Sequence, residues 1–305
     1  MDIIKKTYYD IKSMRVRGAL KIATTAAKAM QTFIENSKEK NISRLISKIK
    51  ISASILKKSR PTAVSLPNAM NFILYSAEEH KNLEISKFKK IMSSEIQKFI
   101  QNQENALDSI ARIGSRLINK EDTVLTHCNS ETAIEIIKAA WDRTKNIDVV
   151  CTETRPRFQG YLSAKEFRAH GIPTTLIIDS AAHYIMKKLE VDKVIVGADA
   201  VCVNGDVINK IGTSQIAVCA DEMDIDFIVA AESIKFSPES IVGKISSIEE
   251  RDTTEITKLR GIKILNPAFD ITEAKYVDMI ITEDGIIPPQ AAYNILKEKF
   301  GWTLK

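Results

Sequence analysis

The chain has 305 residues, of which 44% are hydrophobic and 27% are charged, a composition that fits one large or two ordinary folded domains. Its apolar stretches are short and broken by charges, so none reaches the roughly 20 residues that a transmembrane helix needs. Residues 1–12 lack the apolar centre of a signal peptide. The four cysteines form no close pair, which excludes a zinc ribbon or a small disulfide framework, and we expect reduced thiols in a cytoplasmic protein.

Positive charge is concentrated in the first part of the chain. Residues 1–120 contain 23 Lys and Arg against 10 Asp and Glu, whereas residues 121–305 contain 21 against 29. The basic side chains are scattered through helical sequence, without interleaved aromatic residues or a nucleic-acid-binding motif. We therefore interpret them as a solvated helical surface, and we expect neither a nucleic acid nor a membrane as a partner.

The segment from residue 2 to about residue 117 has a helical pattern, with apolar residues three or four positions apart. Two interruptions place an arginine at a helix boundary. Arg17 precedes Gly18 and an apolar helix, and Arg60 precedes Pro61, which disfavours helical backbone at the residue before it.

After Lys120 the pattern changes to short β-branched runs that recur every 20 to 35 residues, with helical segments between them. Continuous apolar strands that alternate with helices are typical of a parallel sheet covered on both faces. The predicted fold class is α/β, with an N-terminal helical domain at 1–118 and a Rossmann-like, doubly wound domain at 119–305. The predicted strands are Thr123–Thr126, Asp148–Cys151, Thr174–Ile178, Lys193–Val196, Phe227–Ala230 and Asp278–Ile281.

Polar and charged side chains follow these predicted strands. Doubly wound sheets bind ligands outside the carboxyl ends of their strands, so the residues there are the candidates for chemistry. A thiol, several carboxylates and several cations suggest acid–base work on an anionic substrate. The residues are His127, Cys128, Glu153, Arg155, Arg157, Asp179, Asp199, Glu232, Lys235, Glu283 and Asp284.

No cofactor is predicted. The chain has no Gly-x-Gly-x-x-Gly after its first strand and no Gly-x-x-x-x-Gly-Lys-Ser/Thr, the loops that hold dinucleotides and nucleotide phosphates. Its four histidines show no paired spacing with acids or cysteines that resembles a metal site. We expect an activity that needs no metal ion.

Several motifs together resemble one family, from about Arg17 to Glu283 and in the same order. It is the family shared by archaeal ribose-1,5-bisphosphate isomerase, methylthioribose-1-phosphate isomerase and the regulatory subunits of eukaryotic translation initiation factor 2B. The motifs are Arg17-Gly18-Ala19, Arg60-Pro61-Thr62-Ala63, Thr126-His127-Cys128-Asn129-Ser130, Glu153-Thr154-Arg155-Pro156-Arg157-Phe158-Gln159-Gly160, Gly197-Ala198-Asp199-Ala200, Asn204-Gly205-Asp206-Val207-Ile208-Asn209-Lys210-Ile211-Gly212-Thr213 and Ala231-Glu232-Ser233-Ile234-Lys235-Phe236.

The resemblance implies that Cys128 and Asp199 are the catalytic pair of an isomerase. The regulatory subunits typically lack this pair, so its presence in this chain favours an enzyme. The motifs that begin at Arg155 and Ala231 look more like those of the ribose-bisphosphate type. That type of isomerase converts ribose 1,5-bisphosphate to ribulose 1,5-bisphosphate in the salvage of AMP. The resemblance also implies a set of residues that bind the substrate phosphates, with arginine forks, lysine charges and a close glycine amide. These residues are Arg17, Gly18, Arg60, Arg155, Arg157, Asn209, Lys210 and Lys235.

The chemistry of an aldose–ketose shift suggests a role for each member of the pair. We expect Asp199 to protonate the ring oxygen from an apolar, water-poor pocket, and Cys128 to take the proton from carbon 2 as a thiolate stabilised by the following helix. Each residue also has a plain structural interpretation. Cys128 would be a small buried side chain and Asp199 a helix N-cap. Asp179 is expected to cap the helix that starts at Ser180, outside the site.

The expected partner is a phosphorylated sugar, and the resemblance implies a homo-oligomer, either a dimer or a hexamer. Activation by AMP stays open. The alternatives are a non-catalytic regulatory subunit that senses a sugar phosphate or nucleotide, and a methylthioribose-1-phosphate isomerase. Against the second, those enzymes more usually have Asn at the position of Ser65 and a longer chain.

Overall fold

The chain forms two compact units in a computed structural model, which describes residues 3–13, 15–16, 19–60, 64–237 and 248–301. A helical unit comprises Met1–Asn105, Ile234–Phe236 and Asn294–Lys305. A sheet unit comprises Ala106–Ser233 and Ser237–Tyr293. Compared with the predicted boundary between residues 118 and 119, the sheet unit gains the helix that follows Asn105, because that helix packs against another helix of this unit.

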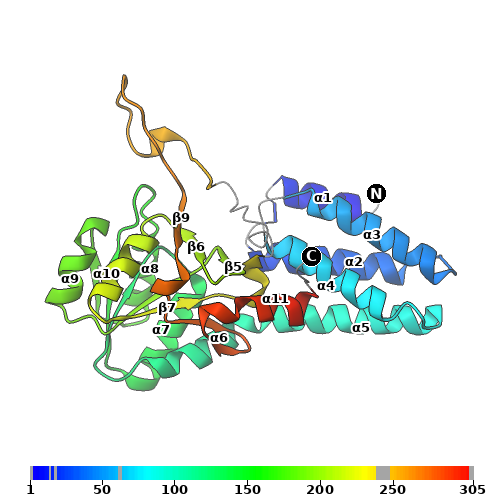
Figure 1. Cartoon of the computed structure of the whole chain (residues 1–305), viewed down its shortest axis with the longest axis horizontal. Helices are drawn as coiled ribbons and strands as arrows, with labels where there is room; N and C mark the ends of the chain where they lie inside the picture. Colours follow the sequence, from blue (N-terminus) through cyan, green and yellow to red (C-terminus); the bar gives the residue numbers. More distant parts are fainter. Residues whose placement is uncertain (1–2, 14, 17–18, 61–63, 238–247, 302–305) are drawn as a thin grey trace. The chain divides into compact units, whose positions relative to one another are not determined.

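The helical unit is built around α2, which packs against α1, α3, α4 and α5 (Figure 1). Small buried side chains on α2, Ala23, Ala26 and Ala27, let the neighbouring helices approach closely. The side-chain amide of Asn68 on α4 donates to the carbonyls of Ile234 and Phe236 and ties that short segment to the same unit. The helices are α1 (Ile3–Lys12), α2 (Ala19–Glu35), α3 (Ile42–Lys57), α4 (Ser65–Glu79) and α5 (Ile85–Glu104).

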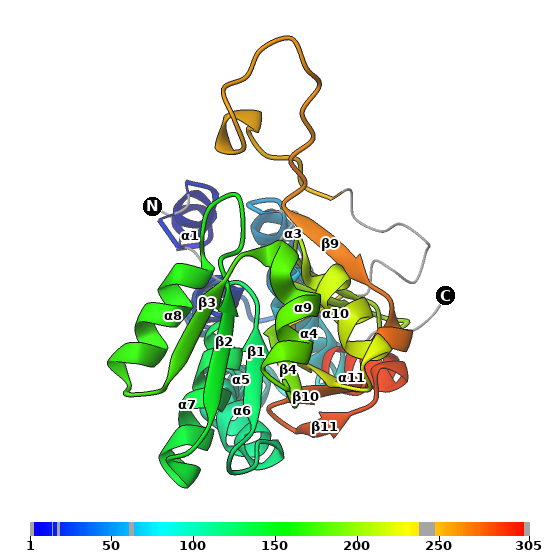
Figure 2. The ribbon, with the colours of Figure 1, turned by 90° about the vertical axis from the view of Figure 1, so that its left-hand side faces the viewer.

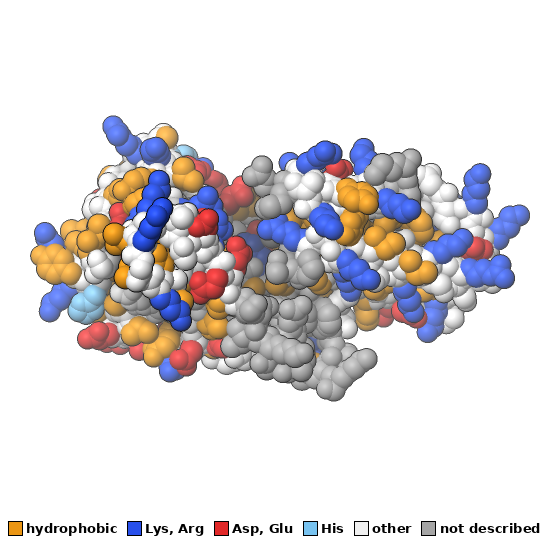
Figure 3. All heavy atoms as spheres, turned by 90° about the horizontal axis from the view of Figure 1, so that it is seen from above, with side chains coloured by type: hydrophobic (Ala, Val, Ile, Leu, Met, Phe, Trp, Pro, Cys, Tyr) orange, Lys and Arg blue, Asp and Glu red, His pale blue; other side chains and the backbone are white. Residues whose placement is uncertain are grey.

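Lysine and arginine side chains are spread over the visible face of these helices rather than gathered in one patch (Figure 3). Lys21, Lys28, Lys48 and Lys50 are exposed examples from α2 and α3. The pattern agrees with the interpretation of a solvated helical surface. No helix among the described residues is both long and apolar enough to cross a membrane.

The sheet unit contains a seven-stranded sheet in the order β11-β10-β7-β4-β1-β2-β3, parallel except for the edge hairpin of β10 and β11. The predicted α/β, doubly wound fold is confirmed. The strands are β1 (Thr123–Thr126), β2 (Asp148–Thr152), β3 (Thr174–Ile177), β4 (Lys193–Gly197), β7 (Asp226–Ala230), β10 (Met279–Thr282) and β11 (Gly285–Ile287). All six predicted strands are present, and the central ones are almost fully buried.

Helices cover both faces of this sheet, with α6, α7 and α8 on one face and α9 and α10 on the other (Figure 2). Ile110 of α6, Ile136 of α7 and Phe167 of α8 meet strand residues in one buried cluster. The helices are α6 (Ala106–Gly114), α7 (Glu131–Thr144), α8 (Gly160–Ala169), α9 (Ala182–Lys188), α10 (Thr213–Glu222) and α11 (Ala292–Phe300), whose last residues join the helical unit.

A second, antiparallel sheet follows β4 and was not predicted. Within the sheet unit its strands run in the order β5-β6-β9, with bounds β5 (Ala200–Cys202), β6 (Val207–Lys210) and β9 (Phe269–Thr272). The strands are short, and polar residues interrupt them, so they carry a weak periodic signal. This sheet brings β9 beside the loop that follows β6.

The strand order reverses between β1 and β4, because the chain proceeds from β1 to β2 and β3 in one direction and from β4 to β7 and β10 in the other. In doubly wound sheets, ligands bind outside the carboxyl ends of the strands at this switch point. Here β1 leads to Cys128 and β4 leads to Asp199.

Candidate active site

Cys128 follows β1 and has left-handed backbone, with φ of 71°. Its backbone N–H donates to the Thr154 hydroxyl at 2.9 Å, and its carbonyl accepts from the Ser163 hydroxyl at 2.8 Å. Non-glycine residues adopt this backbone at a cost of roughly 1–2 kcal/mol, and bonds to neighbouring elements hold it there. The half-buried thiol therefore has a defined position at the switch point of the sheet.

Burial raises the pKa of the Cys128 thiol to about 11. A hydrogen bond from the Asn129 backbone and the charge of Lys210 lower this pKa, whereas the charges of Asp199 and Asp179 raise it. The thiol is consequently protonated near neutral pH. The expected helix-stabilised thiolate is wrong for Cys128, because desolvation raises the pKa more than the backbone hydrogen bond lowers it.

Asp199 lies between β4 and β5 rather than at the start of a helix, so the alternative of a helix N-cap is wrong. Its backbone N–H donates to the Ile208 carbonyl at 2.9 Å, which joins the end of β4 to β6. Its side chain is exposed in the part of the chain that the structure describes, and the water-poor pocket around it stays a prediction. Its charge raises the pKa of the Cys128 thiol.

His127, the residue before Cys128, is buried, with 1% of its surface exposed. Its Nδ1 lies 2.6 Å from the Thr152 hydroxyl oxygen and its Nε2 lies 2.9 Å from the Ile211 carbonyl oxygen. A carbonyl only accepts, so Nε2 carries the proton and Nδ1 accepts from Thr152. Burial lowers the pKa of the imidazole, which keeps it neutral. Its environment makes His127 a link between β1, β2 and the loop after β6.

The last residue of β6, Lys210, carries a positive charge that acts on the thiol. Lys210 is half-buried, its Nζ lies 4.6 Å from the centre of the Phe269 ring, and its charge lowers the pKa of Cys128. Among the described residues, no carboxylate lies within ion-pair distance of Lys210, so the ammonium is available to an anion. Asn209 beside it is buried and donates to the Thr213 hydroxyl at 3.1 Å, which fixes the loop onto α10.

Asp270 on β9 lies opposite Asn209 and supports the same loop. One carboxylate oxygen accepts from the backbone N–H groups of Gly212 and Ser214 at 2.8 and 3.2 Å and from the Ser214 hydroxyl at 2.9 Å. Its other oxygen is buried without a hydrogen-bond partner. Burial raises the pKa of this carboxyl in spite of the three donors. Sequence analysis missed Asp270 because it lies on an unpredicted strand.

Arg155 and Arg157, two predicted phosphate ligands, are exposed on the loop after β2. The Arg155 guanidinium stacks over Phe158 and donates to the Ile256 carbonyl at 3.4 Å. Arg157 lies 3.7 Å from a carboxylate oxygen of Glu255. In the structure both arginines therefore contact the segment around residue 255, and their role as phosphate ligands stays a prediction.

Asp179 was expected to cap a helix, and this expectation is wrong. Its two carboxylate oxygens accept the backbone N–H groups of Thr154 and Arg155, each at 2.7 Å. The carboxylate points from the end of β3 toward the loop after β2, and α9 begins at Ala182 without a side-chain cap. Its position directly after a predicted strand was the only signal in the sequence.

The remaining predicted ligands lie elsewhere in the chain. Arg17 and Gly18 are outside the described residues, and Arg60 and Lys235 belong to the helical unit. The convergence of these residues with Lys210 on one substrate stays a prediction. Of the ten predicted site residues, the sheet unit contains Cys128, Asp199, Arg155, Arg157, Asn209 and Lys210.

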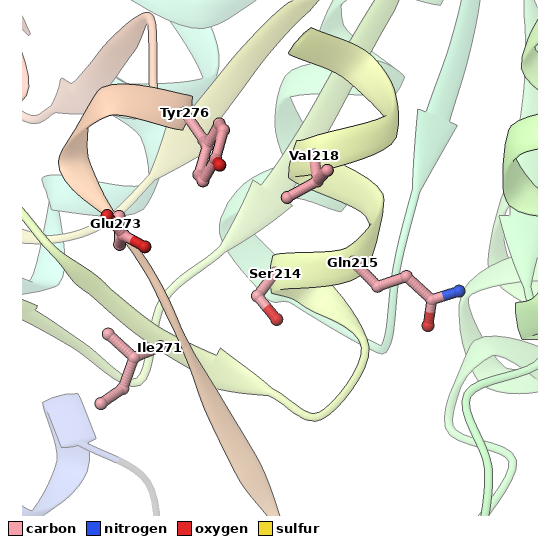
Figure 4. Close-up of a pocket in the computed structure, with 6 residues that line it drawn as sticks. All are labelled: Ser214, Gln215, Val218, Ile271, Glu273 and Tyr276. Carbon is pink, nitrogen blue, oxygen red and sulfur yellow. The ribbon is translucent and has the colours of Figure 1, made fainter. Parts of the chain in front are cut away.

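A shallow pocket of about 290 Å³ lies between α10 and β9 (Figure 4). It does not include the catalytic candidates. Its lining residues are Ser214, Gln215, Val218, Ile271, Glu273 and Tyr276. Within the described part of the chain, no group of three His, Cys, Asp or Glu side chains is arranged to hold a metal ion.

Residues 15–289 match the model of the Initiation factor 2 subunit family. The chain belongs to this family. Its full length is 48% identical to the ribose 1,5-bisphosphate isomerase of Methanocaldococcus jannaschii, an alignment that covers 98% of that protein. A methylthioribose-1-phosphate isomerase of Acetivibrio thermocellus is 42% identical over 94% of this chain and 89% of its own length. The family resemblance read from the motifs is confirmed.

Solved structures in the family have the same fold. The translation initiation factor eIF-2B from Pyrococcus horikoshii aligns with a TM-score of 0.70 and 33% identity, over 94% of this chain and 97% of that one. The 5-methylthioribose 1-phosphate isomerase from Pyrococcus horikoshii aligns with a TM-score of 0.71 and 32% identity, over 98% of this chain and 87% of that one.

Proposed function

We propose that this chain is an isomerase that converts ribose 1,5-bisphosphate to ribulose 1,5-bisphosphate, a step in the salvage of AMP, with Cys128 and Asp199 as its catalytic pair. One observation carries the proposal. Cys128 and Asp199 follow the two strands at the switch point of the sheet, and the charge of Asp199 acts on the Cys128 thiol. The name of the relative with 48% identity supports the choice of substrate.

The reaction requires four proton movements. The bond between carbon 1 and the ring oxygen breaks as that oxygen gains a proton, and carbon 2 then loses a proton to give an enol phosphate. Carbon 1 gains a proton, and the hydroxyl on carbon 2 loses one to give the ketone. Two groups suffice, each of which transfers a proton once in each direction and returns to its starting state.

The group that protonates the ring oxygen must start with a proton. The Cys128 thiol, whose pKa burial raises to about 11, meets this requirement. Asp199 is exposed among the described residues, whereas its expected role as the first acid needs an apolar environment that keeps it protonated. These two environments therefore favour the reverse of the expected division of roles between Cys128 and Asp199. Cys128 protonates the ring oxygen and later takes the proton from the hydroxyl on carbon 2. Asp199 takes the proton from carbon 2 and delivers a proton to carbon 1.

The substrate also brings two phosphates, which need cations. Lys210 supplies an ammonium whose charge acts on the thiol and which has no carboxylate at ion-pair distance among the described residues, and this supports a phosphate near the reacting carbons. Arg17, Gly18, Arg60, Arg155, Arg157, Asn209 and Lys235 complete the proposed set. The homo-oligomer and the effect of AMP stay predictions.

Two other functions have support within the family. A structure named as translation initiation factor eIF-2B is 33% identical to this chain, which favours a regulatory subunit as the second candidate. The 42% identity to a methylthioribose-1-phosphate isomerase favours a different substrate for the same chemistry. A regulatory subunit would bind a phosphorylated ligand and convert none of the sugar phosphates.

A substrate panel separates these functions. Purified full-length protein, treated with a chelator, is incubated with ribose 1,5-bisphosphate, methylthioribose 1-phosphate and ribose 1-phosphate, and the products are followed by phosphorus NMR. We expect conversion of the bisphosphate with kcat/KM about 30- to 150-fold above that of the other two, because a missing phosphate contact costs roughly 2–3 kcal/mol. Preferential conversion of methylthioribose 1-phosphate would contradict the proposed substrate.

A further inference from the structure

The backbone that presents Cys128 is fixed from two strands away. Thr154, in the loop after β2, has left-handed backbone with φ of 62°, and its hydroxyl accepts the Cys128 N–H at 2.9 Å. Its own N–H donates at 2.7 Å to the carboxylate of Asp179, which follows β3. A chain of two hydrogen bonds thus runs from a carboxylate at the sheet edge to the residue that carries the thiol.

The two residues joined by this hydrogen bond both have strained backbone, which the neighbouring hydrogen bonds must hold in place. Cys128 and Thr154 are both non-glycine residues with positive φ, each at a cost of roughly 1–2 kcal/mol. Asp179 binds Thr154 and Arg155 through separate oxygens, so it fixes two successive peptide groups at once. A carboxylate bound to two N–H groups forms charge-assisted bonds, about twice as strong as neutral ones.

We infer that Asp179 is a positioning residue of the site: its carboxylate holds Thr154 in the left-handed conformation, and through the Thr154 hydroxyl it sets the orientation of Cys128. Asp179 is not itself a catalytic residue, because it acts through Thr154. The inference rests on the proposed role of Cys128 for its effect on turnover. Its structural part concerns the Cys128 amide and is independent of any substrate.

Asp179 also acts on the thiol through its charge. The groups whose charges or dipoles reach Cys128 are Lys210 after β6, Asp199 after β4, Asp179 after β3 and the Asn129 N–H. Asp179 is negative and raises the proton affinity of the thiol, so its neutral isostere lowers that affinity. Asp179→Asn keeps one acceptor oxygen and places an amide donor opposite the second N–H, which removes one of the two bonds.

The variants separate the charge from the hydrogen bond. Asp179→Asn removes the charge and one bond, Thr154→Val removes the acceptor for Cys128 while keeping the side-chain shape, and Thr154→Ser retains the acceptor. Asp192→Asn is the matched control, because Asp192 accepts the backbone N–H of Thr123 at 2.8 Å at the opposite end of β1. Asp192 therefore makes the same type of bond, from a carboxylate to a backbone N–H, away from the thiol.

The first measurement needs no substrate. Protein labelled with [¹⁵N]cysteine gives backbone amide signals from four residues, Cys128, Cys151, Cys202 and Cys219, and the Cys128 signal is assigned by its loss in Cys128→Ser. We expect Asp179→Asn and Thr154→Val to shift the Cys128 signal while that of Cys202 stays in place. Asp192→Asn and Thr154→Ser should leave the Cys128 signal near its wild-type position. An unmoved Cys128 signal in Asp179→Asn overturns the inference.

The second measurement is turnover of ribose 1,5-bisphosphate. Asp179→Asn and Thr154→Val should each lower kcat by about 10- to 100-fold, as expected for a misplaced reacting group, and the double variant should be no worse than the poorer single variant. Multiplied losses in the double variant would overturn the path through Thr154. If the wild-type protein shows no turnover, the proposed function fails, and the amide signals still decide the inference.

Discussion

The hydroxyl oxygen of Thr154 accepts a 2.9 Å hydrogen bond from the backbone N–H of Cys128. Through this bond, a residue after β2 controls the backbone of the residue after β1, and both have positive φ. The thiol of Cys128 is consequently placed by contacts outside its own strand. Its chemistry depends on the burial and charges that these contacts create.

The protonation state of Cys128 can be measured directly by alkylation. Because burial raises the pKa of the thiol to about 11, less than about 1% of it is ionised at pH 8, and only the thiolate reacts. We expect the alkylation rate of the Cys128 peptide with iodoacetamide, followed by mass spectrometry, to rise about tenfold per pH unit from pH 7 to pH 10. A rate that levels off at or below pH 8 would show an ionised thiol and remove the argument for Cys128 as the first acid.

Cys128→Ser should separate binding from turnover. The hydroxyl keeps nearly the same shape, but it is a much weaker acid than the thiol and cannot share its proton readily, so kcat should fall by about 100-fold or more. No phosphate contact is removed, and ribose 1,5-bisphosphate should still raise Tm by stabilising the folded state. Cys219→Ser, at a half-buried thiol away from β1, is the matched control and should retain activity. Wild-type turnover in Cys128→Ser would exclude Cys128 from the chemistry.

Lys210→Met tests the proposed phosphate contact. Methionine keeps an apolar side chain over the Phe269 ring while the ammonium charge is lost. The dissociation constant for ribose 1,5-bisphosphate, measured by calorimetry, should rise by about 10- to 100-fold, since a charged hydrogen bond contributes roughly 1.5–3 kcal/mol. Lys165→Met, at an exposed lysine on α8, should bind like wild type. Equal affinities for the two variants would contradict a phosphate ligand at Lys210.

The buried imidazole of His127 predicts a pH dependence of stability. Burial lowers its pKa below the ordinary value of about 6.5, so between the folded and unfolded pKa values the unfolded chain binds more protons. The free energy of unfolding should therefore fall as pH decreases from 7 toward 5, by up to about 1.4 kcal/mol per pH unit from this residue.

His127→Gln provides the comparison, because its amide can still donate to the Ile211 carbonyl but does not titrate. Urea denaturation at pH 5, 6 and 7 should give a smaller loss of stability with acid for this variant than for wild type. The slopes are compared rather than the absolute stabilities, since the substitution also removes the bond to Thr152. Identical slopes would mean that His127 does not remain neutral when folded.

The sequence predicted the sheet because its strands are buried on both faces and read as continuous apolar runs, such as Val194, Ile195 and Val196 in β4. Strands β6 and β9 were missed because polar residues such as Asn209 and Asp270 stand among their apolar ones, and β5 was missed because it has only three residues. The candidate pair followed from the resemblance of two strand-end motifs to those of the family's isomerases. Parallel strand order then brings those ends to one edge of the sheet.

Other features of the site depend on tertiary packing and were beyond the sequence. The side-chain direction of Asp179, toward Thr154 rather than toward the helix after it, follows from the neighbouring loop. The raised pKa of Cys128 follows from burial, which the local helix signal could not reveal. Asp199 likewise lies exposed between β4 and β5, where its backbone N–H donates to the Ile208 carbonyl of β6, and the sequence predicted neither β5 nor β6.

The most direct test of the account is one reaction, ribose 1,5-bisphosphate in D₂O, followed by proton and phosphorus NMR with wild type, Cys128→Ser and Asp199→Asn in parallel. The account predicts that wild type forms ribulose 1,5-bisphosphate with deuterium at carbon 1, because a carboxylate that carries the proton exchanges it with solvent. Both variants should bind the sugar and convert it at least about 100-fold more slowly. A wild-type protein that binds ribose 1,5-bisphosphate and never converts it would contradict the account and leave the regulatory-subunit function in its place.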